Sequence, residues 1–336
     1  MARAPVGAPA SHIAVHPDMT YAVTGSSDPE RALAVVDLRW WSATAYDTLG
    51  FAAIESADPG VAIGGHPPII YHRFISPDFA SGRLESLPVA NILNADYTPT
   101  AEIPLETFPH GEVISHPLKR FCSAIDTGFA CANLVGKGLE PRGLLPYDAS
   151  GRSGGRAFYA RVSGNGKAFT SHIQDAFADE VPWPDWQNDA YFVDWKSEQI
   201  TRVPLGLGWA LRFSSSDVYA LYYTIHPEGD TAYLFDTNPK STTFLQVVAK
   251  IPLDSLQHPL DPDKSPFDEG QQDRMTAITP DGRWGFVSHG GDGLISVIDT
   301  QARQVVKKLE VPTPLEGGGY LVAIQPDMKL GETIGR

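Results

Sequence analysis

The sequence predicts an all-β fold, a β-propeller built from four-stranded antiparallel blades. A turn signature recurs along the whole chain, each copy follows a short apolar run, and each precedes a further strand-like run. Repeats of about 40–60 residues made of short strands are typical of propellers, in which each repeat forms one sheet. The copies that contain proline are His16-Pro17-Asp18-Met19, Ser76-Pro77-Asp78-Phe79, His226-Pro227-Glu228-Gly229, Thr279-Pro280-Asp281-Gly282 and Gln325-Pro326-Asp327-Met328.

Two weaker copies, Ser115-His116-Pro117 and Ser163-Gly164-Asn165-Gly166, fill the long gap in this series. We therefore expect a single domain over residues 1–336. The last repeat starts at Tyr320 and is too short for four strands, so we predict seven blades, one of them incomplete. The blades are expected to begin near residues 10, 69, 111, 156, 218, 274 and 320.

Residues 274–312 form the clearest repeat. The run RMTAIT ends at the Pro-Asp-Gly turn, WGFVSH and LISVID follow as second and third strands, and VVKKLEV completes the unit. Alternation of apolar and polar residues in the second and third strands indicates half-buried antiparallel strands. Third strands also close on an apolar pair and Asp, as in Val297-Ile298-Asp299, and this Asp can cap the following turn.

The stretch TPDGRWGFVSHGGDGLISVIDTQARQVVKKLEV resembles the YVTN-type β-propeller repeat. The resemblance extends to residues 10–50 and 156–205 and is interrupted at 38–68, 132–155 and 252–273. In repeat style the chain is also similar to the heavy chains of quinone-dependent amine dehydrogenases and to periplasmic metal-binding propellers. The resemblance implies a propeller and an extracytoplasmic binding protein, although such a motif specifies fold more than function.

Composition limits the classes of partner that the protein can bind and the cellular compartments in which it can lie. The net charge is −14 with a pI near 5.1, and no basic stripe is present, so we expect no nucleic-acid partner. No apolar run reaches the ~20 residues needed to span a bilayer. The first residues, MARAPVGAPASH, have no apolar signal core. We expect a mature periplasmic or secreted protein, with a cytoplasmic location as the alternative.

The only two cysteines, Cys122 and Cys131, flank the segment SAIDTGFA. If this segment is a hairpin, the two lie opposite each other on neighbouring strands. A cross-strand disulfide would favour an oxidising compartment, and two buried free thiols are the alternative.

The long loops are predicted to share one face of the propeller. Strands alternate in direction within each blade. The connections from a fourth strand to the next first strand therefore lie at the same end of the blades as those from second to third strands. We name this the long-loop face and expect a small ligand or partner protein there, since loops on a rigid scaffold carry function. The loops assigned to it are residues 50–68, 106–111, 173–189, 206–217, 252–273 and 312–319.

The histidines divide between the two faces. Those of the turn signature, His16, His116 and His226, are interpreted as turn residues that hydrogen-bond the backbone, and His72 as an interior residue of a first strand. His258 is placed at the rim. Those predicted on the long-loop face are His12, His66, His110, His172 and His289.

His172 and His289 occupy equivalent positions, at the ends of Phe169-Thr170-Ser171 and Phe286-Val287-Ser288. This position lies at the mouth of the predicted axial channel, where side chains from several blades can converge. With Glu112 or Asp292 nearby, such imidazoles can bind zinc or copper. The alternative is imidazoles that hydrogen-bond channel water.

Three further side chains are candidates for ligand contacts. Trp183 and Trp186, in the proline-stiffened loop VPWPDWQND, can wall a ligand pocket or pack on neighbouring loops. Arg212 can clamp an anion at the channel mouth. The acidic loop 261–269 lacks the glycine of a calcium-binding EF-hand and is interpreted as a solvated rim loop.

The sequence contains no metalloprotease, P-loop or dinucleotide-binding motif. Two hypotheses of different class remain. The first is an extracytoplasmic propeller that binds a metal ion, small ligand or partner protein on the long-loop face. The second is a metal-assisted enzyme or an amine-dehydrogenase-like oxidoreductase subunit with its site at the same channel mouth.

Overall fold

The computed structural model describes residues 12–26, 28–39, 48–52, 56, 59–78, 80–105, 109–152, 154–163, 166–175, 181–256, 273–311, 321, 323, 334 and 335. Within these ranges the chain forms six antiparallel sheets of four successive strands, with one five-residue helix and three short 3-10 helices. The predicted all-β fold is confirmed. Two compact units share the six sheets equally.

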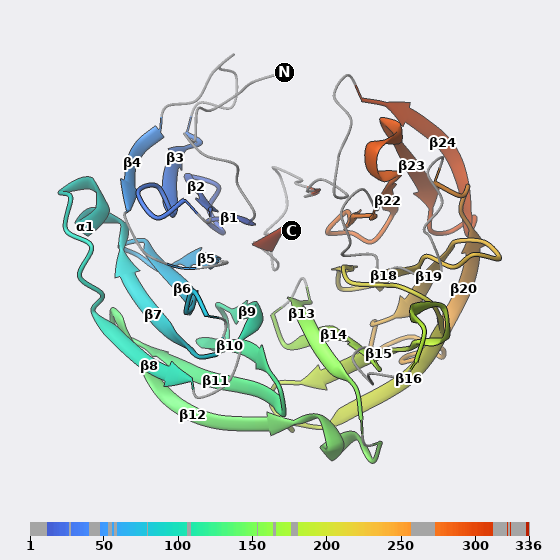
Figure 1. Ribbon diagram of the computed structural model, residues 1–336, viewed down its shortest axis with the longest axis horizontal. Coiled ribbons are helices and arrows are strands. Elements are labelled where there is room, and N and C mark those ends of the chain that lie inside the picture. The colour runs from blue at the N-terminus through green and yellow to red at the C-terminus, as the bar shows by residue number, and fades with distance from the viewer. Residues whose placement is uncertain are drawn as a thin grey trace. The chain divides into compact units, whose positions relative to one another are not determined.

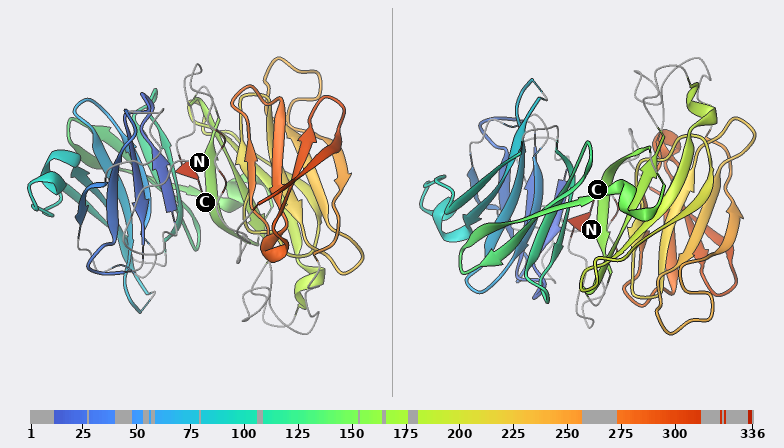
Figure 2. Two further views of the ribbon diagram at one scale, coloured as in Figure 1. Left: turned by 90° about the horizontal axis from the view of Figure 1, so that it is seen from above. Right: turned by 90° about the horizontal axis from the view of Figure 1, so that it is seen from below.

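The first unit comprises residues 1–146 and 326–335 and holds three sheets. Helix α1 (Val89–Leu93) contacts β4 and β7, and Figure 2 shows this teal helix at one margin of the unit. Figure 1 shows the second sheet between the first and the third. The strands are β1 (His12–Val15), β2 (Tyr21–Gly25), β3 (Leu33–Asp37) and β4 (Thr48–Ala52), then β5 (Gly60–Gly64), β6 (Ile69–Ile75), β7 (Gly82–Pro88) and β8 (Ala101–Leu105), then β9 (His110–Ser115), β10 (Arg120–Ile125), β11 (Gly128–Val135) and β12 (Gly138–Pro146).

The second unit comprises residues 147–325 and holds the other three sheets. Its 3-10 helices span Tyr147–Ser150, Trp183–Asp185 and Gly290–Asp292. The strands are β13 (Arg156–Val162), β14 (Ala168–Gln174), β15 (Gln187–Asp194) and β16 (Ile200–Leu207), then β17 (Ser214–Ser215), β18 (Tyr219–Thr224), β19 (Thr231–Asp236) and β20 (Val247–Pro252), then β21 (Thr276–Ile278), β22 (Trp284–Ser288), β23 (Leu294–Asp299) and β24 (Gln304–Glu310).

The predicted count of seven blades is wrong, because the described residues form six four-stranded sheets. The segment assigned to a seventh blade contributes one described strand, β25 (Ile334–Gly335). This strand pairs antiparallel with β1, with Ile13 opposite Gly335, and so extends the first sheet. A segment of that length can complete an existing sheet by pairing with an edge but cannot supply four strands.

The turn signature occupies two different positions in the sheets. The copies at 16, 116, 163 and 279 join first and second strands, whereas those at 76 and 226 join second and third strands. The second sheet therefore begins at Gly60, not near 69, and the fifth at Ser214, not near 218. Neither first strand is followed by a copy of the turn signature: the turn after β5 is Gly65-His66-Pro67-Pro68, and the segment after β17 is Ser216-Asp217-Val218.

Within the first unit, the long connections do not all leave the same end of their sheets. Residues 89–100, which hold α1, join a third strand to a fourth and leave the same end of the sheet as the first-to-second turns. The region 50–68, assigned to one loop, contains parts of β4, all of β5 and the turn from β5 to β6. This end of the first unit, with its first-to-second turns, carries the site described below.

Each unit has its own apolar core. In the first, strand β5 is buried along its whole length, and Ile63, Ile70 and Tyr71 pack with Phe121 of the third sheet. In the second, Tyr222 stacks on Phe213 with ring centroids 4.8 Å apart. The polar turns at the ends of the sheets are therefore held in position by a packed core in each unit.

Cys122 and Cys131 form a disulfide between β10 and β11, where they are directly opposite, with Cα atoms 4.1 Å apart. Of the two alternatives that the sequence left open, the structure therefore contains the cross-strand disulfide. Both side chains are buried.

The disulfide is expected to contribute about 2.5 kcal/mol to the free energy of unfolding, because it closes a loop of sequence separation 9 in the unfolded chain. The variant Cys122→Ser/Cys131→Ser should unfold at correspondingly lower urea concentration than the oxidised protein. Identical urea midpoints for the oxidised protein, the reduced protein and the variant would contradict this contribution.

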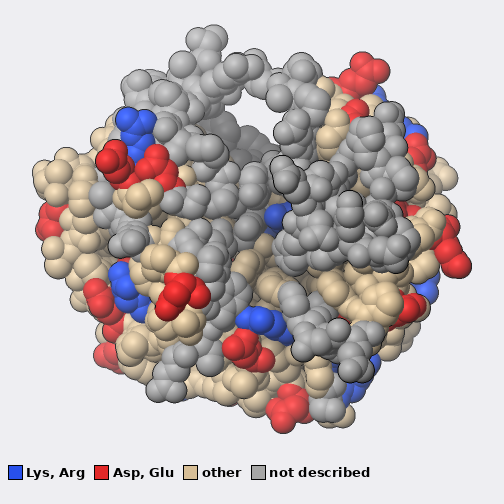
Figure 3. Space-filling model, viewed as in Figure 1, with Lys and Arg blue, Asp and Glu red and all other residues tan. Residues whose placement is uncertain are grey.

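Among the described residues, none of the helices has the length and apolar character required to cross a membrane. On the face drawn in Figure 3, the Lys and Arg side chains of the described residues lie singly among Asp and Glu side chains. This agrees with the scattered basic residues of an acidic sequence.

Candidate metal site

His16, Asp18 and His66 form the one group of three possible metal ligands found among the described residues. One donor atom from each lies within 4.8 Å of the others. His16 and Asp18 lie in the turn from β1 to β2, and His66 lies in the turn from β5 to β6. The first two sheets pack through β1, β2 and β5, which brings these turns together.

Local hydrogen bonds fix the first of these turns. The Met19 amide donates to the His16 carbonyl at 2.7 Å, and Met19 has a left-handed φ of 59°. One Asp18 carboxylate oxygen accepts from the Thr20 amide at 2.9 Å. Partial burial acts to raise the pKa of Asp18, but hydrogen bonds from Thr20 and the charge of His16 outweigh it and hold the pKa below its usual value. Asp18 is therefore an anion at neutral pH.

The two nitrogens of the buried His16 ring face different acceptors. Nε2 lies 3.0 Å from the Gly65 carbonyl oxygen, which can only accept, so Nε2–H is the donor. Nδ1 lies 2.5 Å from Asp18 Oδ1. Either the ring is protonated and Nδ1–H donates to Asp18 Oδ1, or the ring is neutral and Nδ1 keeps a lone pair that accepts from the Asp18 amide at 3.3 Å and can bind a cation beside the carboxylate. A metal-bound imidazole commonly donates its other N–H to a backbone carbonyl, as His16 does here.

His66 completes the group from the neighbouring sheet. Its Nε2 lies 3.9 Å from Asp18 Oδ2, and its ring centroid is 5.2 Å from that of His16. The side chain is 76% exposed, so it can adjust to a metal ion without disturbing the core. Two imidazoles and a carboxylate form a donor set suited to zinc and other first-row divalent metals.

A cavity of about 420 Å³ adjoins this group. His116, from the turn between β9 and β10, lines it and packs against Gly64, where a Cβ atom would lie only 2.1 Å from His116 Cε1. Burial, with a smaller effect of the His16 charge, lowers the pKa of His116 to about 4, so this ring is neutral. The cavity is lined by His16, Pro17, Gly65, His66, Tyr71, His116, Lys119, Leu134 and Gly136.

Three of the histidines predicted on the long-loop face lie in the first unit, but they do not gather. His12 begins β1 and His110 begins β9, whereas His66 lies in a first-to-second turn beside His16. The placement of His66 was wrong because β5 was mistaken for part of a loop. Glu112 is buried in an ion pair with Arg73, at 3.1 Å between Oε2 and Nε.

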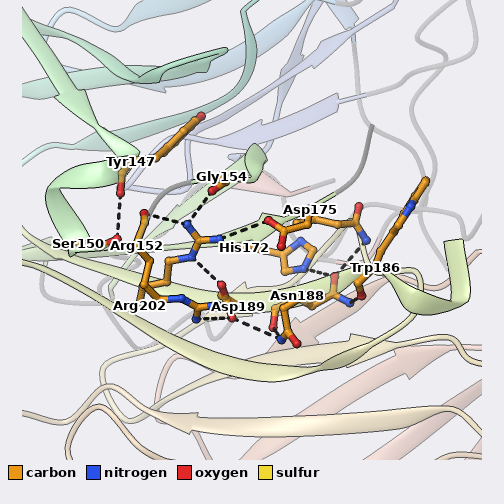
Figure 4. Close-up of polar contacts among 12 residues, drawn as sticks. Tyr147, Ser150, Arg152, Gly154, His172, Asp175, Trp186, Asn188, Asp189 and Arg202 are labelled. Atoms are coloured by element: carbon orange, nitrogen blue, oxygen red, sulfur yellow. Dashed lines mark hydrogen bonds and ion pairs between the residues drawn. The ribbon is translucent and has the colours of Figure 1, made fainter. Parts of the chain in front are cut away.

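His172 and His289 lie in the second unit, and each is buried and hydrogen-bonded within its own sheet. His172 Nε2 lies 2.7 Å from Asn188 Oδ1, as Figure 4 shows, and His289 Nε2 lies 2.7 Å from Ser296 Oγ. Burial lowers the pKa of both rings to about 4, with the Arg274 charge as a smaller cause at His289. A metal site that combines them with histidines of the first unit stays a prediction.

The proposed ligand contacts lie in the second unit. Trp186 donates from Nε1 to the Val181 carbonyl at 2.8 Å and packs on Trp209. Trp183 lines a smaller cavity of about 120 Å³, and Arg212 pairs with Asp273. His258 and the acidic loop 261–269 lie outside the described residues.

The sequence carried a signal for the observed group that the repeat-based reasoning missed. His-Pro dipeptides occur at residues 16, 66 and 116, and successive copies are 50 residues apart. Their regular spacing places one histidine in the first-to-second turn of each sheet of the first unit. His72, assigned to a first strand, is instead a buried residue of the second strand β6 and pairs with Glu85 at 2.9 Å.

No protein-family model and no curated protein matches the sequence. Solved structures match along nearly the whole chain. Hydrazine synthase of Kuenenia stuttgartiensis has a TM-score of 0.63 and 13% identity over 95% of this chain and 90% of that chain. AztD of Citrobacter koseri has a TM-score of 0.56 and 13% identity over 91% and 87%. The β-propeller domain of Cps50 (Swd1) from Myceliophteria thermophila has a TM-score of 0.59 and 10% identity over 91% and 88%. At these identities the likeness shows the fold, that of β-propellers.

Proposed function

We propose that the protein is an extracytoplasmic, YVTN-type β-propeller that binds one divalent transition-metal ion at His16, Asp18 and His66. The observation that carries the proposal is the His16 ring, whose Nε2–H donates to the Gly65 carbonyl while Nδ1 faces the Asp18 carboxylate. A zinc ion coordinated by Nδ1 and the carboxylate would use both lone pairs, with the two atoms moving from 2.5 Å to about 3.3 Å apart, as two bonds of about 2.0 Å at a tetrahedral angle require. His66 Nε2 supplies a third donor within reach.

Zinc is the metal we expect. Two imidazoles and one carboxylate, with one place left for water or a ligand, are the donors of open zinc sites, in which the Zn–N distance is about 2.0–2.1 Å. Copper is expected to compete, since imidazole sites generally bind Cu²⁺ more tightly than Zn²⁺. Thiolate does not take part, because both cysteines are held in the disulfide.

The extracytoplasmic location is supported by that disulfide. Disulfides persist in oxidising compartments and are rare in reducing ones. Cys122 and Cys131 are buried between paired strands, where the bond serves the fold.

A metal-assisted enzyme is the second candidate function. The three donors lie beside a cavity of about 420 Å³, so the open coordination place has room for a ligand. Catalytic zinc sites keep such a place open, whereas structural sites close it with a fourth protein ligand.

His66→Ala is the sharpest test, because this side chain is mostly exposed and its loss should leave the fold intact. Loss of one of three ligands is expected to weaken zinc binding by more than about 100-fold, beyond the effect of removing an outer hydrogen-bond partner. Elemental analysis by mass spectrometry, on protein purified without chelator or affinity metal, should find close to one equivalent of zinc in the wild type. The same analysis should find far less in His66→Ala.

Two controls make this result specific. His226→Ala removes another His-Pro turn histidine, in the second unit, and is expected to retain the metal. His172→Gln/His289→Gln tests the site predicted from sequence. Metal lost from this double variant and kept by His66→Ala would overturn the proposed site and favour the predicted one.

A further inference from the structure

We propose that the cavity beside His16, Asp18 and His66 binds a small organic carboxylate, one oxygen of which fills the open place on the metal ion. This inference rests on the proposed metal site and specifies its ligand. The cavity, of about 420 Å³, lies within the range of about 300–1,000 Å³ typical of small-molecule sites. It is built entirely from the first unit.

The charge around the cavity favours an anion. Of the described residues that line it, none is acidic and one, Lys119, is a cation. Within the described part of the chain, no carboxylate forms an ion pair with Lys119. A divalent ion beside one Asp18 carboxylate leaves a further positive charge to be balanced.

His116 supplies a polar group that nothing in the described structure satisfies. Its Nε2 is buried and has no hydrogen-bond partner among the described residues. A buried polar atom without a partner is unfavourable, so a ligand that supplies one gains affinity. In the Nε2–H tautomer this ring can donate to the carboxylate oxygen that the metal does not hold.

The walls favour a carboxylate with an apolar body over inorganic phosphate. Tyr71, Leu134 and Pro17 form apolar surface in the same cavity. Burial raises the pKa of Tyr71 to about 12, so its phenol remains neutral and adds no repelling charge. Phosphate sites usually gather several donors, often from arginine forks, and no arginine is among the described lining residues.

The test uses the full chain loaded with Co²⁺, whose visible absorption reports both metal binding and changes in its ligands. We expect one equivalent of Co²⁺ to bind and benzoate to shift the spectrum. In calorimetry, benzoate should bind the zinc-loaded protein at least tenfold more tightly than the metal-free protein. Lys119→Met should weaken benzoate binding about tenfold at unchanged metal stoichiometry, whereas Lys196→Met, an exposed lysine of the second unit, should not.

Each outcome separates this inference from the proposed function. A stoichiometric Co²⁺ spectrum that benzoate leaves unchanged would overturn the carboxylate site while the metal site stands. Tighter binding of inorganic phosphate than of benzoate would also overturn it. Failure of the wild type to bind Co²⁺ and Zn²⁺ would overturn the metal site itself, and the inference with it.

Discussion

Replacing Asp189 by asparagine is expected to lower the free energy of unfolding by about 3–5 kcal/mol, the usual cost of removing one partner of a buried ion pair. Asp189 is fully buried, and its two carboxylate oxygens lie 2.6 Å from Arg202 Nε and 2.9 Å from Arg152 Nη1. Figure 4 shows these three side chains converging between β15, β16 and the segment before β13. Removal of the anion would leave the 1% exposed Arg202 guanidinium with the Gly154 carbonyl and, at 3.6 Å, the half-exposed Asp175 carboxylate.

Asp254→Asn is the matched control. Asp254 pairs with Lys308, and both side chains are largely exposed, at 59% and 44%. Water and salt screen such surface pairs, so the substitution should cost no more than about 1 kcal/mol. Urea unfolding of the two variants should therefore differ by several kcal/mol. Equal effects would mean that Asp175, 3.6 Å from Arg202 Nη2, replaces Asp189 as the counter-ion.

The sequence predicted strand positions correctly in those sheets whose strands and turns are marked by residues close together in the chain. In the sixth sheet the Pro-Asp-Gly turn joins β21 to β22, and the predicted strands WGFVSH and LISVID correspond to β22 and β23. Turn chemistry and alternation act within a few residues, so a single sequence reveals them. In the second sheet the signature lies one turn later, and this shift alone misplaced β5, His66 and His72.

Strand β5 shows why its position could not be read locally. Its sequence, GVAIG, has glycine at both ends and resembles a loop. Both positions require glycine because side chains of the neighbouring sheet leave no room for a Cβ atom. A Cβ at Gly60 would lie 2.0 Å from Glu112 Oε2, and one at Gly64 would lie 2.1 Å from the His116 ring. Such requirements come from residues about 50 positions away in the chain and appear only when the sheets are packed.

The same holds for the candidate site. The sequence predicts imidazole ligands and zinc or copper as the metal, but it does not identify which of the ten histidines lie together. His16 and His116 were interpreted as turn residues, and both do lie in turns. The second role that we propose for them depends on the turns of packed sheets meeting at one end, and this in turn depends on which connection of each sheet holds the turn signature.

Acidification from pH 6.5 to 4.5 is expected to remove about 4 kcal/mol of stability through two buried histidines of the second unit. Burial lowers the pKa of His172 and of His289 from 6.5 to about 4. Between these values the unfolded chain binds a proton at each site and the folded chain does not. Stability is therefore full above the unfolded value and falls as the pH drops toward 4, by about 1.4 kcal/mol per pH unit for each ring.

His172→Gln/His289→Gln isolates this effect, because glutamine can donate to Asn188 Oδ1 and Ser296 Oγ and does not titrate. The free energy of unfolding should be measured with urea at pH 7.5, 6.5, 5.5 and 4.5. For the wild type it should fall steeply as the pH drops, and for the variant the slope against pH should be smaller by the equivalent of about two protons. The variant is then the more acid-resistant protein even if it is less stable at pH 7.5. Parallel curves for the two proteins would show that both imidazoles are protonated in the folded state, and burial would then not be the property that governs them.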